Sequence, residues 1–270
     1  MRCALINSGL GLLATASELH RLRPDADLVI AMDPDGMPWG PRSPHDIAER
    51  SLALARGTAS YEPDVIIMAC NTGSVHALDV LRSEFEPDIP IVGTVPAIKP
   101  AAAAAPSVAI WATVATTESA YQRRLIAEFG AGAEVTSVAC PGLATAVDAG
   151  DGDAIESAIA HAAARTPHTC GALVLGCTEY ELAADQIAAA VPSAILFGSA
   201  TAVATQALRR ATQRLAADVE QPTDTIATGR LIVLLSGRRA SLPPAALQYS
   251  QGRQLARLDV GLDPASGLAI

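Results

Sequence analysis

Hydrophobic residues along the chain gather in short runs, and these alternate with longer segments in which apolar positions recur every three or four residues. The short runs predict buried strands and the longer segments predict amphipathic helices. The predicted strands are residues 2–6, 27–31, 65–69, 91–94, 107–112, 134–138, 172–175, 194–197 and 232–235. The predicted helices are residues 11–22, 44–59, 74–84, 119–129, 153–165, 181–190 and 200–216. This alternation is typical of an α/β protein with parallel sheets, and we expect an irregular tail after Gly237.

One pattern occurs twice. VIIMACNTGSVHALDVL (residues 65–81) and ALVLGCTEYELAADQI (residues 172–187) each read as a strand, a small residue, a cysteine, a nearby threonine and a helix. Ligands of open α/β sheets bind beyond the carboxyl ends of the strands, where helix N-termini present free N–H groups. Cys70 and Cys177 are therefore predicted to face each other across a pocket.

Composition narrows the function classes. The 270 residues are 50% hydrophobic and 17% charged, so a sizeable core is expected and disorder is not. A formal net charge of −9, from 19 basic and 28 acidic side chains, argues against a nucleic-acid partner. The uncharged stretch 100–117 contains Pro106 and consists mostly of Ala and Thr, so no membrane span is expected.

Five cysteines without a repeated CxxC pair do not resemble a disulfide framework. With no apolar leader in the first residues, we expect a cytoplasmic protein. Cys3, Cys140 and Cys170 are interpreted as buried structural residues.

Two cysteines in matching settings suggest acid/base chemistry. A helix N-terminus lowers the pKa of a thiol from about 8.5 and so favours the thiolate. Thiols on opposite faces of one carbon can remove a proton from one face and return one to the other, which is racemisation or epimerisation. The alternative for either cysteine alone is an inert core residue.

The sequence gives little support for a catalytic cofactor or metal ion. The only lysine, Lys99, lies just before a proline, which disfavours a pyridoxal-phosphate mechanism. The five histidines form no ligand-spaced pair with a carboxylate, so no metal is expected.

Several motifs follow one another in a characteristic order. They are INSGLGL (residues 6–12), MPWGPRS (37–43), MACNTGS (68–74), VPAIKPA (95–101) and LGCTEY (175–180). Together they resemble the glutamate racemase branch of the aspartate/glutamate racemase superfamily. The resemblance implies two pseudo-symmetric, doubly wound lobes with the active site in the cleft between them. Residues 1–96 plus 203–270 would form the lobe with Cys70, and residues 97–202 the lobe with Cys177.

The same resemblance implies a cofactor-independent racemase that supplies D-glutamate for peptidoglycan. Its only implied partner is a small amino-acid substrate, and the sequence is compatible with a homodimer. Cys70 and Cys177 become the acid/base thiols, and Asp148 an acidic residue that supports the chemistry. The implied substrate-binding residues are Ser8, Pro38, Trp39, Gly40, Asn71, Thr72, Thr116 and Thr178.

Three residues depart from the family pattern. Asn7 stands where glutamate racemases have an aspartate, and Glu179 where they have the histidine of CTH. We expect both to take part in the catalytic site, with the charge lost at one offset at the other. Glu179 should also raise the pKa of the neighbouring thiol. Trp39 replaces a tyrosine and so changes the pocket wall.

These departures leave alternatives open. The CTE form of the second motif occurs in aspartate racemases, so the substrate could be aspartate or, given Trp39, another amino acid. A catalytically silent paralogue that binds an amino acid or a protein partner is a second alternative.

Asp33 and Asp35 are interpreted as turn residues around Gly36.

Overall fold

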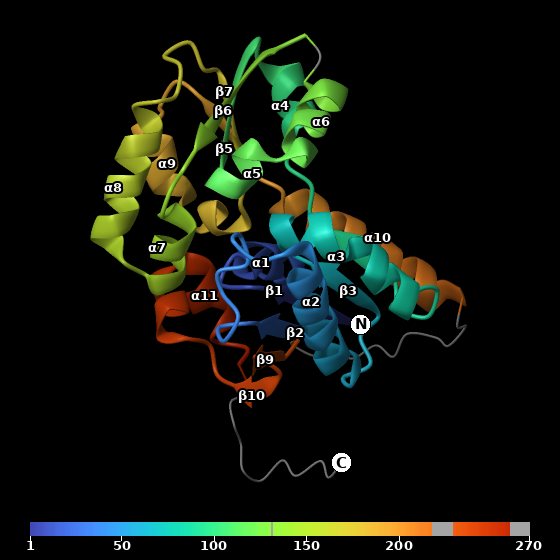
Figure 1. The fold of residues 1–270 in the computed structure, drawn as a ribbon. Helices are drawn as coiled ribbons and strands as arrows, with labels where there is room; N and C mark the ends of the chain where they lie inside the picture. Colours follow the sequence, from blue (N-terminus) through green and yellow to red (C-terminus); the bar gives the residue numbers. More distant parts are fainter. Residues whose placement is uncertain (131, 218–228, 260–270) are drawn as a thin grey trace.

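The computed structural model describes residues 1–130, 132–217 and 229–259, and these residues form two sheets (Figure 1). Sheet A is six-stranded, and all neighbouring strands are parallel except β10, which is antiparallel to β9. Its order is β10 (Arg238–Ala240), β9 (Leu231–Leu235), β2 (Asp27–Met32), β1 (Arg2–Asn7), β3 (Val65–Met68) and β4 (Ile91–Gly93).

Sheet B is four-stranded and fully parallel. Its order is β6 (Glu134–Ala139), β5 (Ser107–Ala112), β7 (Ala172–Leu175) and β8 (Ile195–Phe197). The inner strands β5 and β7 are buried along their whole length, whereas the edge strands are partly exposed. Burial on both faces explains why the inner strands read as continuous apolar runs in the sequence.

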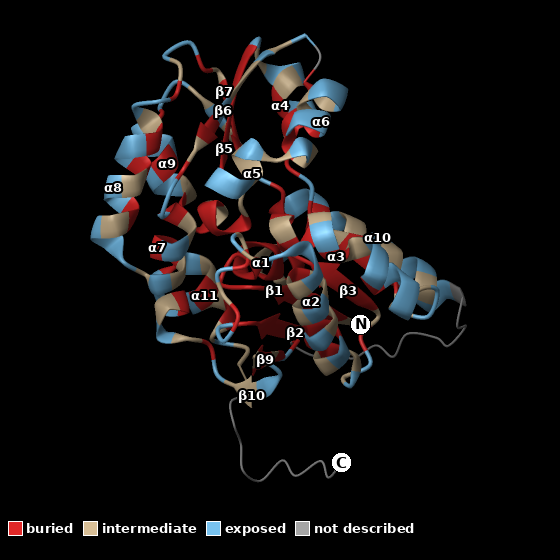
Figure 2. Ribbon diagram, viewed as in Figure 1, coloured by how far each residue is buried: buried red, intermediate tan, exposed pale blue. Residues whose placement is uncertain are grey.

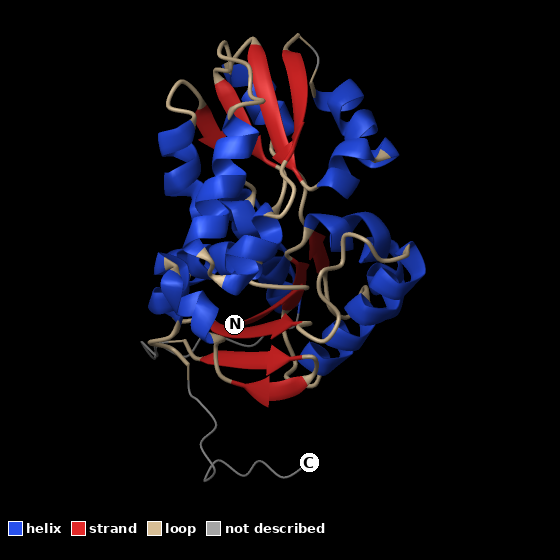
Figure 3. Ribbon diagram, turned by 60° about the vertical axis from the view of Figure 1, so that its left-hand side comes forward, coloured by secondary structure: helices blue, strands red, loops and turns tan. Residues whose placement is uncertain are grey.

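Helices cover both faces of each sheet (Figure 3). Helices α2 and α3 pack on one face of sheet A, and α4 and α6 on one face of sheet B. Between the sheets, one apolar cluster joins α1, α10 and α11 to α7, α8, α9 and the 3₁₀ helix η1. Their bounds are α1 (Leu12–Leu22), α2 (Pro44–Ala59), α3 (Asn71–Phe85), α4 (Ile98–Ala104), α5 (Val114–Glu118), α6 (Ala120–Phe129), α7 (Leu143–Ala149), α8 (Gly152–Ala163), η1 (Thr178–Ala183), α9 (Ala184–Ala190), α10 (Ala200–Ala217), η2 (Pro244–Gln248) and α11 (Ser250–Leu255).

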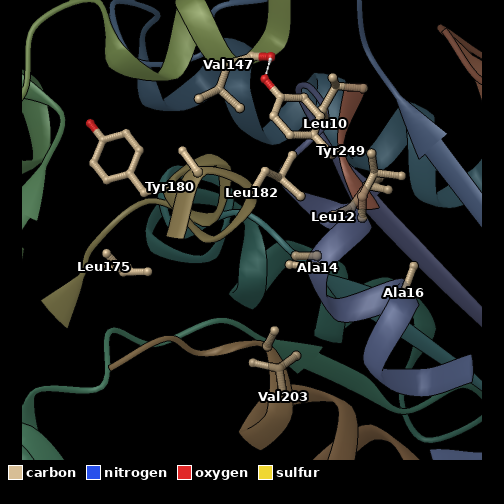
Figure 4. Packing of buried hydrophobic residues seen from close by; sticks show 14 of the residues in the cluster. Leu10, Leu12, Ala14, Ala16, Val147, Leu175, Tyr180, Leu182, Val203 and Tyr249 are labelled. Atoms are coloured by element: carbon tan, nitrogen blue, oxygen red, sulfur yellow. Dashed lines mark hydrogen bonds between the residues drawn. The ribbon is translucent and has the colours of Figure 1, made fainter. Parts of the chain in front are cut away.

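The shared cluster fixes the two sheets against each other. Figure 4 shows Leu12 and Ala14 of α1, Leu182 of η1 and Val203 of α10 among its members. The hydroxyl of Tyr249 donates a hydrogen bond to the Val147 carbonyl at 2.7 Å, which ties the C-terminal segment to α7. In Figure 2, α1 and the central strands of sheet A are coloured largely as buried.

The irregular tail predicted after Gly237 is wrong for the residues that the structure describes. Residues 238–259 form β10, η2 and α11, and they pack Leu242, Ala246 and Leu255 into the shared cluster. These short elements lack a long periodic pattern, and tertiary contacts rather than local propensity define them. The prediction for residues 260–270 lies outside the described residues.

The alanine-rich stretch 100–117 divides among α4, β5 and α5. No helix among the described residues is long and apolar enough to cross a membrane. The lobe boundaries predicted at residues 96 and 203 stay a proposal, and residues 218–228 and 260–270 of the first lobe lie outside the described residues.

Candidate active site

A cavity of about 430 Å³ lies where β1, β3, β5, β6 and β7 end. Every predicted site residue lines it except Asn7 and Thr178, which are buried directly behind it. The predicted residues on its wall are Ser8, Pro38, Trp39, Gly40, Cys70, Asn71, Thr72, Thr116, Asp148, Cys177 and Glu179. The carboxyl-end placement follows the rule for ligand sites in open parallel sheets.

Cys70 follows β3 and caps α3, where its Sγ accepts a hydrogen bond from Gly73 N at 3.4 Å. Burial, together with the smaller effect of the Glu179 carboxylate, raises the pKa of this thiol to about 12. The backbone N–H groups of Gly73, Thr72 and Ser8 lower the pKa only in part. The expected net lowering by the helix N-terminus is therefore wrong, because desolvation outweighs the N–H groups.

Cys177 follows β7 and is half-buried. Its Sγ donates a hydrogen bond to Glu179 Oε2 at 2.8 Å. Burial raises the pKa of Cys177 well above its usual range, and the charge of Glu179 and the Cys70 thiol add to the rise. The predicted effect of Glu179 on the thiol is confirmed in direction.

Asn7 lies at the end of β1 and is fully buried. Its Nδ2 donates to Ala69 O at 2.7 Å and to Thr178 Oγ1 at 3.2 Å, while its Oδ1 accepts from Ser8 N at 2.6 Å. Ala69 directly precedes Cys70 and Thr178 directly follows Cys177. The asparagine amide therefore bridges the two cysteine segments, which an ionised aspartate could not do because it has no donor.

Asp148 reaches the cavity from α7, and its Oδ1 accepts a hydrogen bond from Leu10 N at 2.7 Å. Burial raises the pKa of Asp148 to about 8, and the Glu179 charge contributes to the rise. The turn after β1 comes close to these groups because it is glycine-rich. A Cβ at Gly9 would lie 2.5 Å from Asp148 Oδ2, and one at Gly11 would lie 2.7 Å from Glu179 Oε1.

Asn71 connects the two sheets at the base of the cavity. Its Nδ2 donates to Gly176 O, the carbonyl before Cys177, at 2.5 Å. Its Oδ1 is buried and has no hydrogen-bond partner among the residues that the structure describes. A buried acceptor without a partner is costly, so this oxygen is suited to a ligand donor. Across the cavity, Thr116 Oγ1 of α5 accepts a hydrogen bond from Thr113 Oγ1 at 2.9 Å.

Trp39 forms a wall of the cavity and is only 1% exposed. Its ring lies over the first turn of α3, where a Cβ at Gly73 would approach Trp39 Cζ3 to 3.1 Å. The indole Nε1 donates to Asp33 Oδ2 at 3.0 Å, and Arg50 Nη1 donates to the same oxygen at 3.1 Å.

Asp33 is the clearest residue that sequence reasoning missed. The predicted turn is present, because Gly36 N donates to Asp33 O at 3.0 Å, but the buried carboxylate also anchors the cavity wall. Thr113, Thr145 and Cys140 also line the cavity. Cys140 is buried as predicted, and its position after β6 was the signal that could have placed it at this edge.

Groups that could hold a metal or cofactor are scarce around the site. Within the described ranges, no set of three His, Cys, Asp or Glu residues is arranged to bind a metal ion. Lys99 lies on α4 and is not part of the cavity wall.

A sequence profile of the Asp/Glu/hydantoin racemase family matches residues 6–219. The chain belongs to this racemase family. It is 34% identical over 211 residues to a glutamate racemase of Pseudomonas entomophila, which covers 76% of this chain and 79% of that protein. It is also 34% identical over 239 residues to a glutamate racemase of Herpetosiphon aurantiacus, covering 86% and 91% of the two chains.

Solved racemase structures share the fold. The Escherichia coli glutamate racemase, crystallised with L-glutamate and the activator UDP-MurNAc-Ala, matches with a TM-score of 0.76 at 25% identity, covering 92% of this chain and 91% of the other. The predicted fold class, with parallel α/β sheets of the Asp/Glu racemase type, is therefore confirmed.

Proposed function

We propose that this racemase interconverts L- and D-glutamate by moving the α-proton between Cys70 and Cys177. The observation that carries the proposal is that two thiols reach one cavity from the strand ends of two different sheets. Groups on opposite faces of the α-carbon can remove a proton from one face and return one to the other, which inverts the configuration. The curated relatives named glutamate racemase support glutamate as the substrate.

Glu179 prepares one of the thiols for this reaction. It already accepts the Cys177 S–H hydrogen, so it can take this proton and leave a thiolate beside the substrate. Burial makes each thiolate a stronger base, because it disfavours the charged form and raises the pKa. The positive ammonium of a bound amino acid would offset this effect and favour the thiolate as the substrate enters.

Recognition of the substrate follows from the polar groups on the wall. The unpartnered Oδ1 of Asn71 and the carboxyl groups of Asp148 and Glu179 suit the α-ammonium. The N–H groups at the start of α3 suit a carboxylate.

The side-chain carboxylate of glutamate needs partners of another kind. None of the described residues on the cavity wall is Lys, Arg or His. We therefore assign this carboxylate to hydroxyl and N–H donors such as Ser8, Thr113 and Thr116.

The test is incubation of the purified protein with single L-amino acids in D2O. Loss of the α-proton signal is followed together with chiral chromatography. We expect exchange and inversion on glutamate. Exchange and inversion on aspartate instead would assign the chain to the alternative suggested by its CTE motif. Absence of exchange on every amino acid would overturn the proposed reaction.

A further inference from the structure

Glu181 is a largely enclosed carboxylate that takes no part in the mechanism above. Its Oε1 accepts hydrogen bonds from Ser199 N and Ser199 Oγ, both at 2.8 Å, and Ala200 N approaches both carboxylate oxygens at 3.2 Å. Burial raises the pKa of Glu181, while these donors lower it. The carboxylate therefore caps the first turn of α10 from a segment 18 residues earlier in the chain.

The backbone around this cap is shaped to receive the carboxylate. A Cβ at Gly198 would lie 2.6 Å from Glu181 Oε2, so the absence of a side chain there makes room for it. A negative group at the start of a long helix also interacts favourably with the helix dipole. Since α10 has 18 residues, its first turn is a firm anchor for the segment that reaches it.

This anchor lies where the chain leaves sheet B. Strand β8 ends at Phe197, and α10 then packs against α1 and β3 of the sheet A side. Val203, Ala204, Ala207 and Ala211 hold α10 in the apolar cluster between the sheets. The start of α10 is thus fixed relative to both sheets.

The other end of the Glu181 contact is the segment that carries the second thiol. Glu181 belongs to η1, the six-residue 3₁₀ helix that begins directly after Cys177 and contains Glu179. A short 3₁₀ helix has poor hydrogen-bond geometry, so its position depends on outside contacts. The Cys177 side chain makes no capping bond to η1, unlike Cys70 at α3.

We propose that Glu181 is a positioning residue for the racemisation, holding η1 against α10 so that Cys177 and Glu179 keep their places in the cavity. This inference rests on the proposed function, since it assigns Cys177 the role of one of the two bases. Loss of the contact should displace Cys177 while leaving Cys70, which α3 holds separately, in place.

The test compares Glu181→Gln with the wild type, because glutamine weakens the contact: it loses the negative charge and replaces one of the two oxygens near Ala200 N with an NH2 donor. Asp185→Asn serves as the matched control, because it removes one exposed carboxylate from the first turn of the neighbouring helix α9. We expect Glu181→Gln to lower kcat by up to about 100-fold, the scale of a small misplacement of a reacting group, with little change in KM. Asp185→Asn should match the wild type, and Ser199→Ala should show a smaller loss in the same direction as Glu181→Gln.

A second readout separates positioning from a general loss of folded protein. For the enantiomer that Cys70 deprotonates, a displaced Cys177 returns the proton poorly, so α-proton exchange in D2O should exceed inversion in Glu181→Gln. Equal losses of exchange and inversion, or no loss, would overturn the proposal.

A third readout does not require activity. Iodoacetamide labelling of each thiol, followed by mass spectrometry, should show a several-fold change at Cys177 relative to Cys70 in Glu181→Gln. An unchanged labelling ratio would contradict the positioning role. If the wild type exchanges no amino acid, the proposed reaction fails, and this ratio alone decides the role of Glu181.

Discussion

The two cysteine segments share a sequence pattern but differ in the hydrogen bonds that their sulfur atoms make. Cys70 directly precedes a 15-residue α-helix, and its sulfur accepts a backbone hydrogen bond. Cys177 directly precedes a six-residue 3₁₀ helix, and its sulfur donates to a carboxylate. Cys70 therefore sits among N–H donors that favour its thiolate, whereas Cys177 relies on a neighbouring acceptor for its proton. Matching motifs at matching strand ends thus do not ensure matching electrostatics.

Among the tests of this comparison, we expect the largest effect from removing each thiol in turn. Cys70→Ser and Cys177→Ser should each lower racemisation by about 10²- to 10⁴-fold, the usual contribution of a general acid or base. Steady-state rates in both directions, measured by chiral chromatography, check this result. Cys140→Ser is the matched control, because this buried cysteine also lines the cavity but has no role in the proposed proton transfer. Normal racemisation by either catalytic variant would disprove the two-base mechanism.

Removing the acceptor next to Cys177 should have the next largest effect. Glu179→Gln loses the group that takes the thiol proton, and it removes a charge that raises the pKa values of Cys70, Cys177 and Asp148. Both limbs of the pH profile of kcat/KM should therefore move to lower pH, and kcat should fall. The profile is measured on the variant and the wild type in parallel. An unchanged pH profile would mean that the Glu179 charge does not influence the pKa values of the thiols during turnover.

Asn7 joins the two segments, so changing it should affect both. In Asn7→Asp, a carboxylate oxygen would face the Ala69 carbonyl, now 2.7 Å from Nδ2. We expect a loss of about 1–3 kcal/mol in the free energy of unfolding, measured by urea titration, because a buried acceptor loses its donor.

The same position tests the proposed charge compensation. Asn7 Nδ2 and Glu179 Oε1 both lie within 2.8 Å of the place where a Cβ on Gly11 would be, so the two sites are close enough to couple. The double variant Asn7→Asp with Glu179→His should be less impaired in turnover than the two single effects combined. Strictly additive effects would exclude compensation, as would single variants that leave turnover unaltered.

Asp148 should change how the stability of the folded chain depends on pH. Its pKa is raised to about 8 in the folded chain, so the folded state holds a proton that the unfolded state loses near pH 4. The contribution of Asp148 to the free energy of unfolding is therefore present at low pH, and it is lost as the pH rises from about 4 to about 8. Asp148→Asn stays neutral, so its unfolding free energy should fall less over that range than that of the wild type. Urea titrations at both ends of the range check this difference, and equal slopes would contradict it.

Much of the fold could be predicted because the buried strands are continuous apolar runs. The predicted ranges for β5, β7 and α2 agree with the structure at both ends. Helix α3 begins three residues earlier than predicted, since the Cys70 sulfur acts as its cap and extends the first turn. Helices α4, α5 and α7 were not predicted, because helices of five to seven residues have too few turns to show a period.

The residues of the site also divide into those that the sequence could place and those that it could not. Residues next to the cysteines could be placed because they share local motifs with a known family. The role of Asp33 could not, because its partners Arg50 and Ser236 lie 17 and 203 residues away in the chain. The bridging bonds of Asn7 also depend on contacts across 62 and 171 residues, which a sequence pattern does not reveal. Long-range polar partners are thus what the structure adds to the motifs.

The pairing of β2 with β9 has a consequence for synthesis on the ribosome. Residues 28–32 pair with residues 231–235, so sheet A has one of its inner strands only after every strand of sheet B has been made. Closing so long a loop is entropically costly and slow compared with local pairing. Until β9 emerges, one edge of β2 is open to other strands in the cell.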